Sequence, residues 1–149
     1  MNETTRAPED LDPALLALLG DRKLGTLVTL KRDGRPQLSN VLHAWDADAR
    51  TLRVSVTESR VKVANIRRDP RVSYLVSTEA GWSYTVAEGR GELGAVTQAP
   101  DDDAADELVA LYRQLGGEHD DWDDYRRSMV AEQRLVLRIE VERVYGLGQ

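Results

Sequence analysis

Residues 51–70 read TLRVSVTESRVKVANIRRDP, and this stretch combines the two features that decide the fold. In its first seven residues, Leu and Val alternate with polar or charged residues, which is the period-two pattern of a strand with one buried face. A short helix is expected to follow, capped by Ser59 and ended before Pro70. A strand that leads into a helix N-terminus presents free backbone N–H groups and the positive end of the helix dipole. This junction is therefore a candidate anion-binding site.

Strand patterns recur on both sides of this junction. The expected strands cover residues 25–31, 36–45, 51–57, 72–77, 82–93 and 136–144. An Asp33–Gly34 turn joins the first two, and Gly89 with Gly91 predicts a bend or bulge in the fifth. The expected helices cover residues 13–20, 59–68, 101–115 and 122–133. About six strands with short helices inserted late predict a mainly β protein, built as a small closed β-barrel decorated by helices.

Length and composition limit the class of protein. A chain of 149 residues predicts one domain, which we place at residues 11–149 after a disordered tail at residues 1–10. A net charge of −6 disfavours a general nucleic-acid surface. No apolar run approaches the ~18 residues of a membrane span, and no signal peptide is visible. A soluble cytoplasmic protein that binds neither nucleic acid nor membrane is expected.

Self-contained catalytic motifs are not found in the sequence. The chain has no cysteine, and its two histidines, His43 and His119, lie far apart. Residues 101–124 carry ten carboxylates and one arginine, but without the spacing of a calcium loop, so they are expected to be solvated helix starts. GxSxG, P-loop and GxGxxG patterns are absent. We therefore nominate no catalytic residue and no metal site, and any chemistry is expected to come from a bound cofactor.

The basic residues of the opening stretch allow two interpretations. Arg60 offers a planar fork suited to phosphate oxygens and Lys62 a movable charge, so the two cations could converge on one anion. Alternatively, both could coat an exposed helix together with Arg67 and Arg68. Charge alone favours the second interpretation. Arg67 and Arg68 are assigned to the solvated end of the helix in either case.

Three segments in order resemble a known family. They are GTLVTLKRDGRPQLSNV at 25–41, SVTESRVKVANIRRDPRVSYLV at 55–76 and GWSYTVAEGRGEL at 81–93. Together they look like the split β-barrel flavin and deazaflavin oxidoreductases, the FMN-binding or pyridoxamine 5′-phosphate oxidase-like fold. LYRQLGGEHDDWDDYRRSMV at 111–130 and VYGL at 144–147 resemble the actinobacterial branch that binds the deazaflavin coenzyme F420.

The resemblance implies a cofactor cleft at the interface of a homodimer. The two cations would hold the cofactor phosphate, and three residues of the second strand would lie near the ring or its polar tail. The strand end at 55–56 would approach the ring, at its second residue through the backbone, and two aromatic residues would line the pocket, partly from the partner subunit. The cofactor-binding residues implied in this way are Gln37, Ser39, Asn40, Ser55, Val56, Arg60, Lys62, Trp82 and Tyr84.

The expected function follows from that resemblance. It is an F420-dependent reductase that transfers a hydride from the reduced deazaflavin to an electron-poor small molecule such as an enone, a quinone or a tetrapyrrole. Two alternatives stay open: the same fold using FMN, and a non-catalytic protein that binds or carries F420. A haem-binding relative is a further alternative, to which His43 and His119 give little support.

Overall fold

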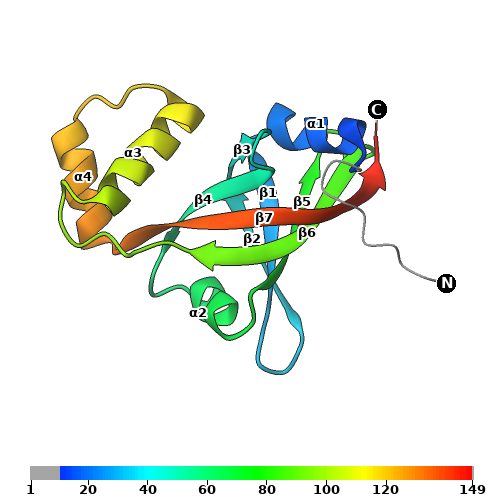
Figure 1. Ribbon diagram of the computed structural model, residues 1–149, viewed down its shortest axis with the longest axis horizontal. Helices are drawn as coiled ribbons and strands as arrows, with labels where there is room; N and C mark the ends of the chain where they lie inside the picture. Colours follow the sequence, from blue (N-terminus) through cyan, green and yellow to red (C-terminus); the bar gives the residue numbers. More distant parts are fainter. Residues whose placement is uncertain (1–10, 149) are drawn as a thin grey trace.

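Seven antiparallel strands form one sheet that curls into a half-barrel in the computed structural model, which describes residues 11–148 (Figure 1). The strand order is β2-β1-β5-β6-β7-β4-β3. The strands are β1 (Leu24–Leu30), β2 (Pro36–Leu42), β3 (Ala44–Asp46), β4 (Thr51–Thr57), β5 (Arg71–Ser77), β6 (Tyr84–Leu93) and β7 (Arg134–Leu147). The mainly β fold expected from the sequence is confirmed, with an open half-barrel in place of a fully closed one.

Helices occupy three positions around the sheet. In Figure 1, α1 and α2 lie toward opposite ends of the barrel, and α3 and α4 form a hairpin beside it. The helices are α1 (Pro13–Asp21), α2 (Val61–Arg68), α3 (Asp103–Gly116) and α4 (Trp122–Ala131). The Asp102 carboxylate caps α3 by accepting from the Ala105 N–H, and that of Asp121 caps α4 by accepting from the Asp124 N–H. The expected acidic helix starts are thus confirmed.

The period-two pattern of β4 places one face of this strand in the core. Leu52, Val54 and Val56 are at most 2% exposed, whereas the residues between them are only partly buried. Leucine and valine side chains from β1, β5 and β7, and Tyr74 of β5, belong to the same cluster, together with residues of α1 and α2. Burial of such side chains is the main driving force for folding, at about 1.5–3 kcal/mol for each fully buried aliphatic side chain.

The expected strand at 36–45 is divided into β2 and β3 by the buried residue His43. Its Nδ1 lies 2.6 Å from the Tyr74 hydroxyl, and its Nε2 lies 2.8 Å from the Leu19 carbonyl oxygen. Burial lowers the pKa of His43, so the neutral ring accepts from the phenol at Nδ1 and donates at Nε2. Gly25 leaves room for Tyr74, since a Cβ at residue 25 would overlap the phenol ring. The seventh strand arises from this break.

The long β6–β7 ladder contains the bulge that the glycines predicted. Its register shifts between Glu88 and Gly89, and a Cβ at Gly89 would overlap the carbonyl oxygen of Glu140. Only glycine allows so close an approach of two backbones, and the extra residue bends the strand. β6 and β7 have ten and fourteen residues, whereas each of the other strands has seven or fewer. β6 and β7 therefore carry much of the curvature of the half-barrel.

The α3–α4 hairpin is inserted between β6 and β7 and has its own small core. Leu108, Leu111 and Met129 of the hairpin pack on Val136 of β7 and on Ala44. Ion pairs Arg138–Glu107 and Arg126–Asp106 secure the hairpin to the sheet and its two helices to each other. The hairpin is thereby fixed beside β4, where its inner side becomes one wall of a cavity.

Candidate functional site

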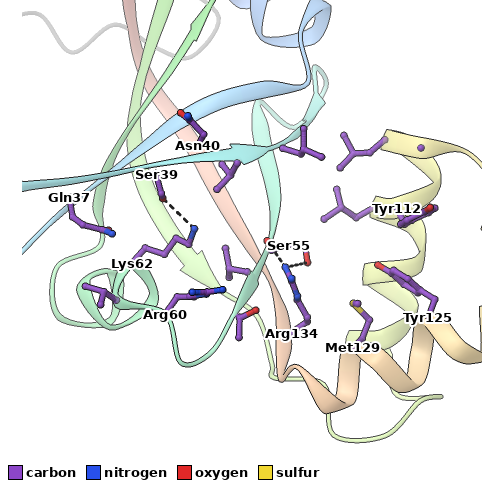
Figure 2. Close-up of a pocket in the computed structure, with 18 residues that line it drawn as sticks. Gln37, Ser39, Asn40, Ser55, Arg60, Lys62, Tyr112, Tyr125, Met129 and Arg134 are labelled. Carbon is purple, nitrogen blue, oxygen red and sulfur yellow. Dashed lines mark hydrogen bonds between the residues drawn. The ribbon is translucent and has the colours of Figure 1, made fainter.

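A cavity of about 860 Å³ lies between β2, β4, the start of α2 and the α3–α4 hairpin (Figure 2). One side is polar and the other is apolar or aromatic. The polar side is formed by Gln37, Ser39, Asn40, Ser55, Arg60, Lys62 and Arg134. The opposite side is formed by Leu111, Tyr112, Leu115, Tyr125 and Met129. The cavity is large enough for a drug-sized or cofactor-sized ligand.

Two cations at the start of α2 point into the cavity. Arg60 occupies the N-cap position of α2 without a side-chain capping bond, and Lys62 is the second helical residue. The expected cap at Ser59 is therefore wrong. The Arg60 N–H donates to the Thr57 carbonyl oxygen at 3.0 Å, which closes a turn over residues 57–60 and starts the helix later. Because the Arg60 side chain makes no capping hydrogen bond, its guanidinium is available to a ligand.

Lys62 is held at the polar end by β2. Its ammonium donates to the Ser39 hydroxyl at 3.2 Å. Partial burial, and after it the charges of Arg60 and Arg134, lower the pKa of Lys62. None of the residues that line the cavity in the described chain is acidic. Arg60 and Lys62 form no ion pair with a carboxylate among the described residues, so this end of the cavity is a site for an anion.

Arg134 was not predicted from the sequence as a residue of the site. It is the first residue of β7 and pairs with Thr57 of β4. This pairing places Arg134 beside the start of α2, although it follows Arg60 by 74 residues in the chain. The expected final strand began two residues later, at residue 136. Strand pairing over such a separation leaves no local signal in a single sequence.

The apolar wall belongs to a cluster of four aromatic rings. Tyr112 and Tyr125 line the cavity, and His119 and Trp122 pack against them with ring centroids 5.0–5.6 Å apart. The Tyr125 hydroxyl donates to the Leu108 carbonyl oxygen at 3.1 Å, and burial raises the pKa of Tyr125. His119 is thus part of an aromatic cluster. The wall offers a fixed surface for the flat apolar face of a ligand.

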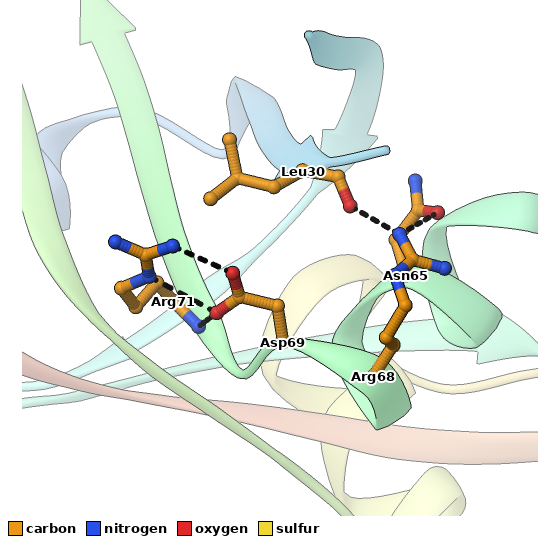
Figure 3. A network of polar contacts seen from close by, with 5 residues as sticks. All are labelled: Leu30, Asn65, Arg68, Asp69 and Arg71. Carbon is orange, nitrogen blue, oxygen red and sulfur yellow. Dashed lines mark hydrogen bonds and ion pairs between the residues drawn. The ribbon is translucent and has the colours of Figure 1, made fainter. Parts of the chain in front are cut away.

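A chain of hydrogen bonds orients the Gln37 amide. The Gln37 Oε1 accepts from the Thr29 hydroxyl at 3.1 Å, which itself accepts from the Asn65 Nδ2 at 3.1 Å. Arg68 then donates to the Asn65 Oδ1 at 3.0 Å and to the Leu30 carbonyl oxygen at 2.6 Å (Figure 3). Since the carbonyl of Gln37 is engaged, its NH₂ group is left for the cavity. Arg68 therefore does more than coat the helix end.

The other residues named from the sequence lie at different distances from the centre of the cavity. Ser55 lines it beside Arg134, and Val56 lines it although its side chain is buried in the core, which leaves its backbone for a ligand. Asn40 lies at the rim on the opposite face of β2 from Ser39, where its side-chain oxygen accepts from Thr26 at 2.8 Å. The polar side of the predicted site is thus brought together in space.

Trp82 and Tyr84 do not line this cavity within the single chain. Trp82 is 81% exposed just before β6, and Tyr84 is the first residue of that strand. Their expected contribution came partly from a partner subunit, and it stays a prediction. Arg67 forms an exposed ion pair with Glu58 at 2.6 Å, as a residue of a solvated helix end is expected to do.

Residues 11–148 contain no cluster of three His, Asp or Glu side chains that could hold a metal ion. In the same residues, no helix is long and apolar enough to cross a membrane.

A curled antiparallel half-barrel with an anion-receptive cavity beside its edge strand defines the split β-barrel class of proteins. The sequence model of the pyridoxamine 5′-phosphate oxidase family matches residues 11–148. The chain therefore belongs to the pyridoxamine 5′-phosphate oxidase family.

Known relatives span nearly the whole chain. An F420H(2)-dependent biliverdin reductase from Mycobacterium tuberculosis is 28% identical over 146 residues, which cover 98% of this chain and 92% of the relative. A conserved hypothetical protein from Mycobacterium tuberculosis has a similar structure, with a TM-score of 0.71, 21% identity and coverage of 97% and 89% of the two chains. An F420 reductase follows with a TM-score of 0.66, 21% identity and coverage of 93% and 98%. The two structures show the shared fold.

Proposed function

We propose that this protein is an F420-dependent oxidoreductase that reduces an electron-poor, conjugated small molecule. The observation that carries the proposal is the division of the cavity into a cationic end without any acidic lining residue and an apolar, aromatic wall. Such a cavity fits a ligand with a phosphate at one end and a flat ring at the other. Similarity to an F420H(2)-dependent biliverdin reductase favours the deazaflavin among such ligands.

The residues of this chain bind and orient in the proposed reaction. Arg60 and Lys62 hold the phosphate, and a bound anion offsets the burial and the repulsion that lower the pKa of Lys62. The NH₂ group of Gln37 and the hydroxyl of Ser39 offer hydrogen bonds along the cofactor, and the backbone at Ser55 and Val56 approaches the ring. When bound, the reduced deazaflavin supplies a hydride to the acceptor. Completion of the two-electron reduction takes one proton, which solvent supplies in the open cavity.

A tetrapyrrole of the biliverdin type is the acceptor that we favour over an enone or a quinone. The aromatic wall of Tyr112 and Tyr125, extended by Leu111 and Met129, offers a broad apolar surface to an extended conjugated molecule. The relative from Mycobacterium tuberculosis is named for the same substrate. Both observations support the acceptor class.

We also propose that the protein works as a homodimer formed through the outer face of the sheet. The outer face is the side of the sheet opposite to the core residues Leu27 and Tyr74, and the strand registers place several apolar side chains on it. Its exposed members are Leu24, Leu38, Leu42, Leu75, Tyr145 and Leu147. Tyr84 lies on the same face, and Asn40 connects that face to the rim of the cavity. A second copy on this face accounts for the exposed apolar surface and brings Trp82 and Tyr84 toward the partner's cavity.

Two alternatives make different predictions. An FMN enzyme would use the same phosphate site and purify with a yellow flavin. A carrier would bind F420 without reducing any acceptor. Haem ligation by His43 is disfavoured, because both ring nitrogens of this buried residue already have hydrogen-bond partners.

An anaerobic single-turnover assay tests the proposal. The protein is mixed with reduced F420 and with biliverdin, a quinone or an enone, and the absorbance of oxidised F420 and of the acceptor is followed. We expect biliverdin to be consumed at a rate that depends on protein concentration. Reduction of an acceptor by reduced FMN but not by reduced F420 would contradict the choice of cofactor. Tight F420 binding without reduction of any acceptor would favour the carrier.

A further inference from the structure

Arg134 has hydrogen-bonding capacity that the chain itself does not use. Its Nε is shielded from solvent and has no hydrogen-bond partner among the described residues. Its Nη1 lies 3.4 Å from the Ser55 hydroxyl and 3.5 Å from the Ser55 carbonyl oxygen, at the limit of hydrogen-bond distance. Only Nη2 has a closer partner, the Glu132 carboxylate at 3.1 Å. An arginine has five N–H donors, so this guanidinium is incompletely satisfied.

The position of Arg134 separates it from the phosphate end. Arg60 and Lys62 project from the start of α2, and Lys62 turns toward Ser39 on β2. Arg134 instead rises from β7 between that end and the side chains of Tyr125 and Met129 (Figure 2). A ligand that reaches Arg134 therefore has its body against the apolar wall.

We propose that Arg134 binds a carboxylate of the acceptor and so selects flat conjugated acceptors that carry a carboxylate side chain. Nη1 and the second N–H of Nη2 form the end of the planar guanidinium that matches the two oxygens of a carboxylate in a bidentate contact, and the apolar wall receives the conjugated body. This inference rests on the proposed function for the identity of the cavity. It adds the chemical class of the acceptor and the residue that recognises it.

Direct binding measurements test the inference without turnover. Biliverdin, which carries two propionate groups, and its dimethyl ester are titrated into the protein, with pigment absorbance and tryptophan quenching as readouts. The variants are Arg134→Gln, Arg134→Lys and Arg60→Gln, and F420 is titrated into each by fluorescence. Arg127→Gln is the matched control, because Arg127 is 64% exposed on α4 and does not line the cavity.

We expect Arg134→Gln to raise the Kd of biliverdin about tenfold or more, as loss of a charged hydrogen bond does. The same change should leave the Kd values of the dimethyl ester and of F420 within about twofold, since neither uses Arg134. Arg134→Lys keeps the charge and should retain part of the preference for biliverdin over its ester. If Arg134→Gln unfolds the protein, the Lys variant and the comparison of biliverdin with its ester in the unaltered protein still decide the inference.

Three results would overturn the inference. One is equal binding of biliverdin and its ester by the unaltered protein, or no binding of biliverdin with or without F420. Another is equal weakening of biliverdin and its ester by Arg134→Gln. The third is weakening of F420 by Arg134→Gln to the extent seen in Arg60→Gln, which would assign Arg134 to the cofactor. Failure of the proposed function is distinguishable, because it appears as absence of F420 binding by the unaltered protein.

Discussion

The Lys62 ammonium donates a hydrogen bond of 3.2 Å to the Ser39 hydroxyl and so connects α2 to β2 across the cavity. β2 is one edge of the sheet, whereas the strand that leads into α2, β4, is next to the other edge. Curling of the sheet is therefore what brings the two residues together. The site depends on the closure of the half-barrel as much as on the residues that line it.

Cofactor binding should weaken at alkaline pH through Lys62. Its pKa lies below the ordinary value of 10.5 because of partial burial and the nearby cations Arg60 and Arg134. Only the protonated amine attracts a phosphate, so affinity is present below the pKa and declines as pH rises through it. A bound anion raises the pKa of Lys62 again. The affinity should therefore start to decline near the pKa of the free protein and level off above the higher pKa of the complex. F420 titrations between pH 7 and pH 10 measure the effect.

Lys62→Arg is the control for this pH dependence. Arginine keeps its charge throughout the range, so the variant should lose the decline. A decline of the same size in both proteins would assign it to another group.

Replacement of Asn65 should destabilise the protein. Asn65 is 4% exposed and connects Thr29 of β1 to Arg68 of α2. Asn65→Ala leaves buried polar partners unsatisfied, which costs about 1–3 kcal/mol of unfolding free energy. Urea denaturation gives the value. Arg67→Ala on the same helix removes only a half-exposed ion pair and should cost at most about 1 kcal/mol. Equal losses in the two variants would contradict the role given to Asn65.

Gly25→Ala should destabilise the core. The added methyl group would overlap the Tyr74 ring, which His43 holds in place. Overpacking of this kind costs about 1–3 kcal/mol, measurable by thermal or urea unfolding. Gly116→Ala is the matched control, because its Cβ would lie at an ordinary 3.6 Å from Tyr112. A Gly25→Ala variant as stable as the unaltered protein would show that the ring moves easily.

A charge on the outer face of the sheet should break the proposed dimer. Leu75 lies on β5 within that face, so Leu75→Asp places a carboxylate in the predicted interface. Sedimentation velocity should show a dimer for the unaltered protein and a monomer of 16.7 kDa for the variant. Val61→Asp is the control, since Val61 is 58% exposed but belongs to α2. Sedimentation of the unaltered protein as a monomer would contradict the proposed dimer.

Local features of the fold could be predicted from the sequence, because local patterns determine them. The alternation in β4, the glycine-dependent bulge near Gly89 and the acidic starts of α3 and α4 are all as expected. The break at His43 was not predicted, because it depends on a buried bond to Tyr74, which is distant in sequence. The Ser59 cap was wrong since a turn shifted the helix start.

Only part of the candidate site could be predicted from the sequence, for the same reason. Arg60 and Lys62 belong to one short stretch whose residue types indicate an anion. Arg134 reaches the cavity through strand pairing, and the aromatic wall reaches it through packing of the inserted hairpin on β7. Neither placement has a local sequence pattern, so one sequence without the structure could not reveal them.

A fluorescence titration of F420 and FMN tests the central claim most directly. It compares the unaltered protein, the double variant Arg60→Ala/Lys62→Ala and a control, Arg67→Ala/Arg127→Ala, which removes two cations outside the cavity. The proposed site predicts submillimolar F420 binding, weakened about tenfold or more in the first variant and unchanged in the control, since each lost phosphate contact costs about 1.5–3 kcal/mol. Equal F420 affinity in all three proteins would contradict the site, and binding of FMN alone would contradict the cofactor.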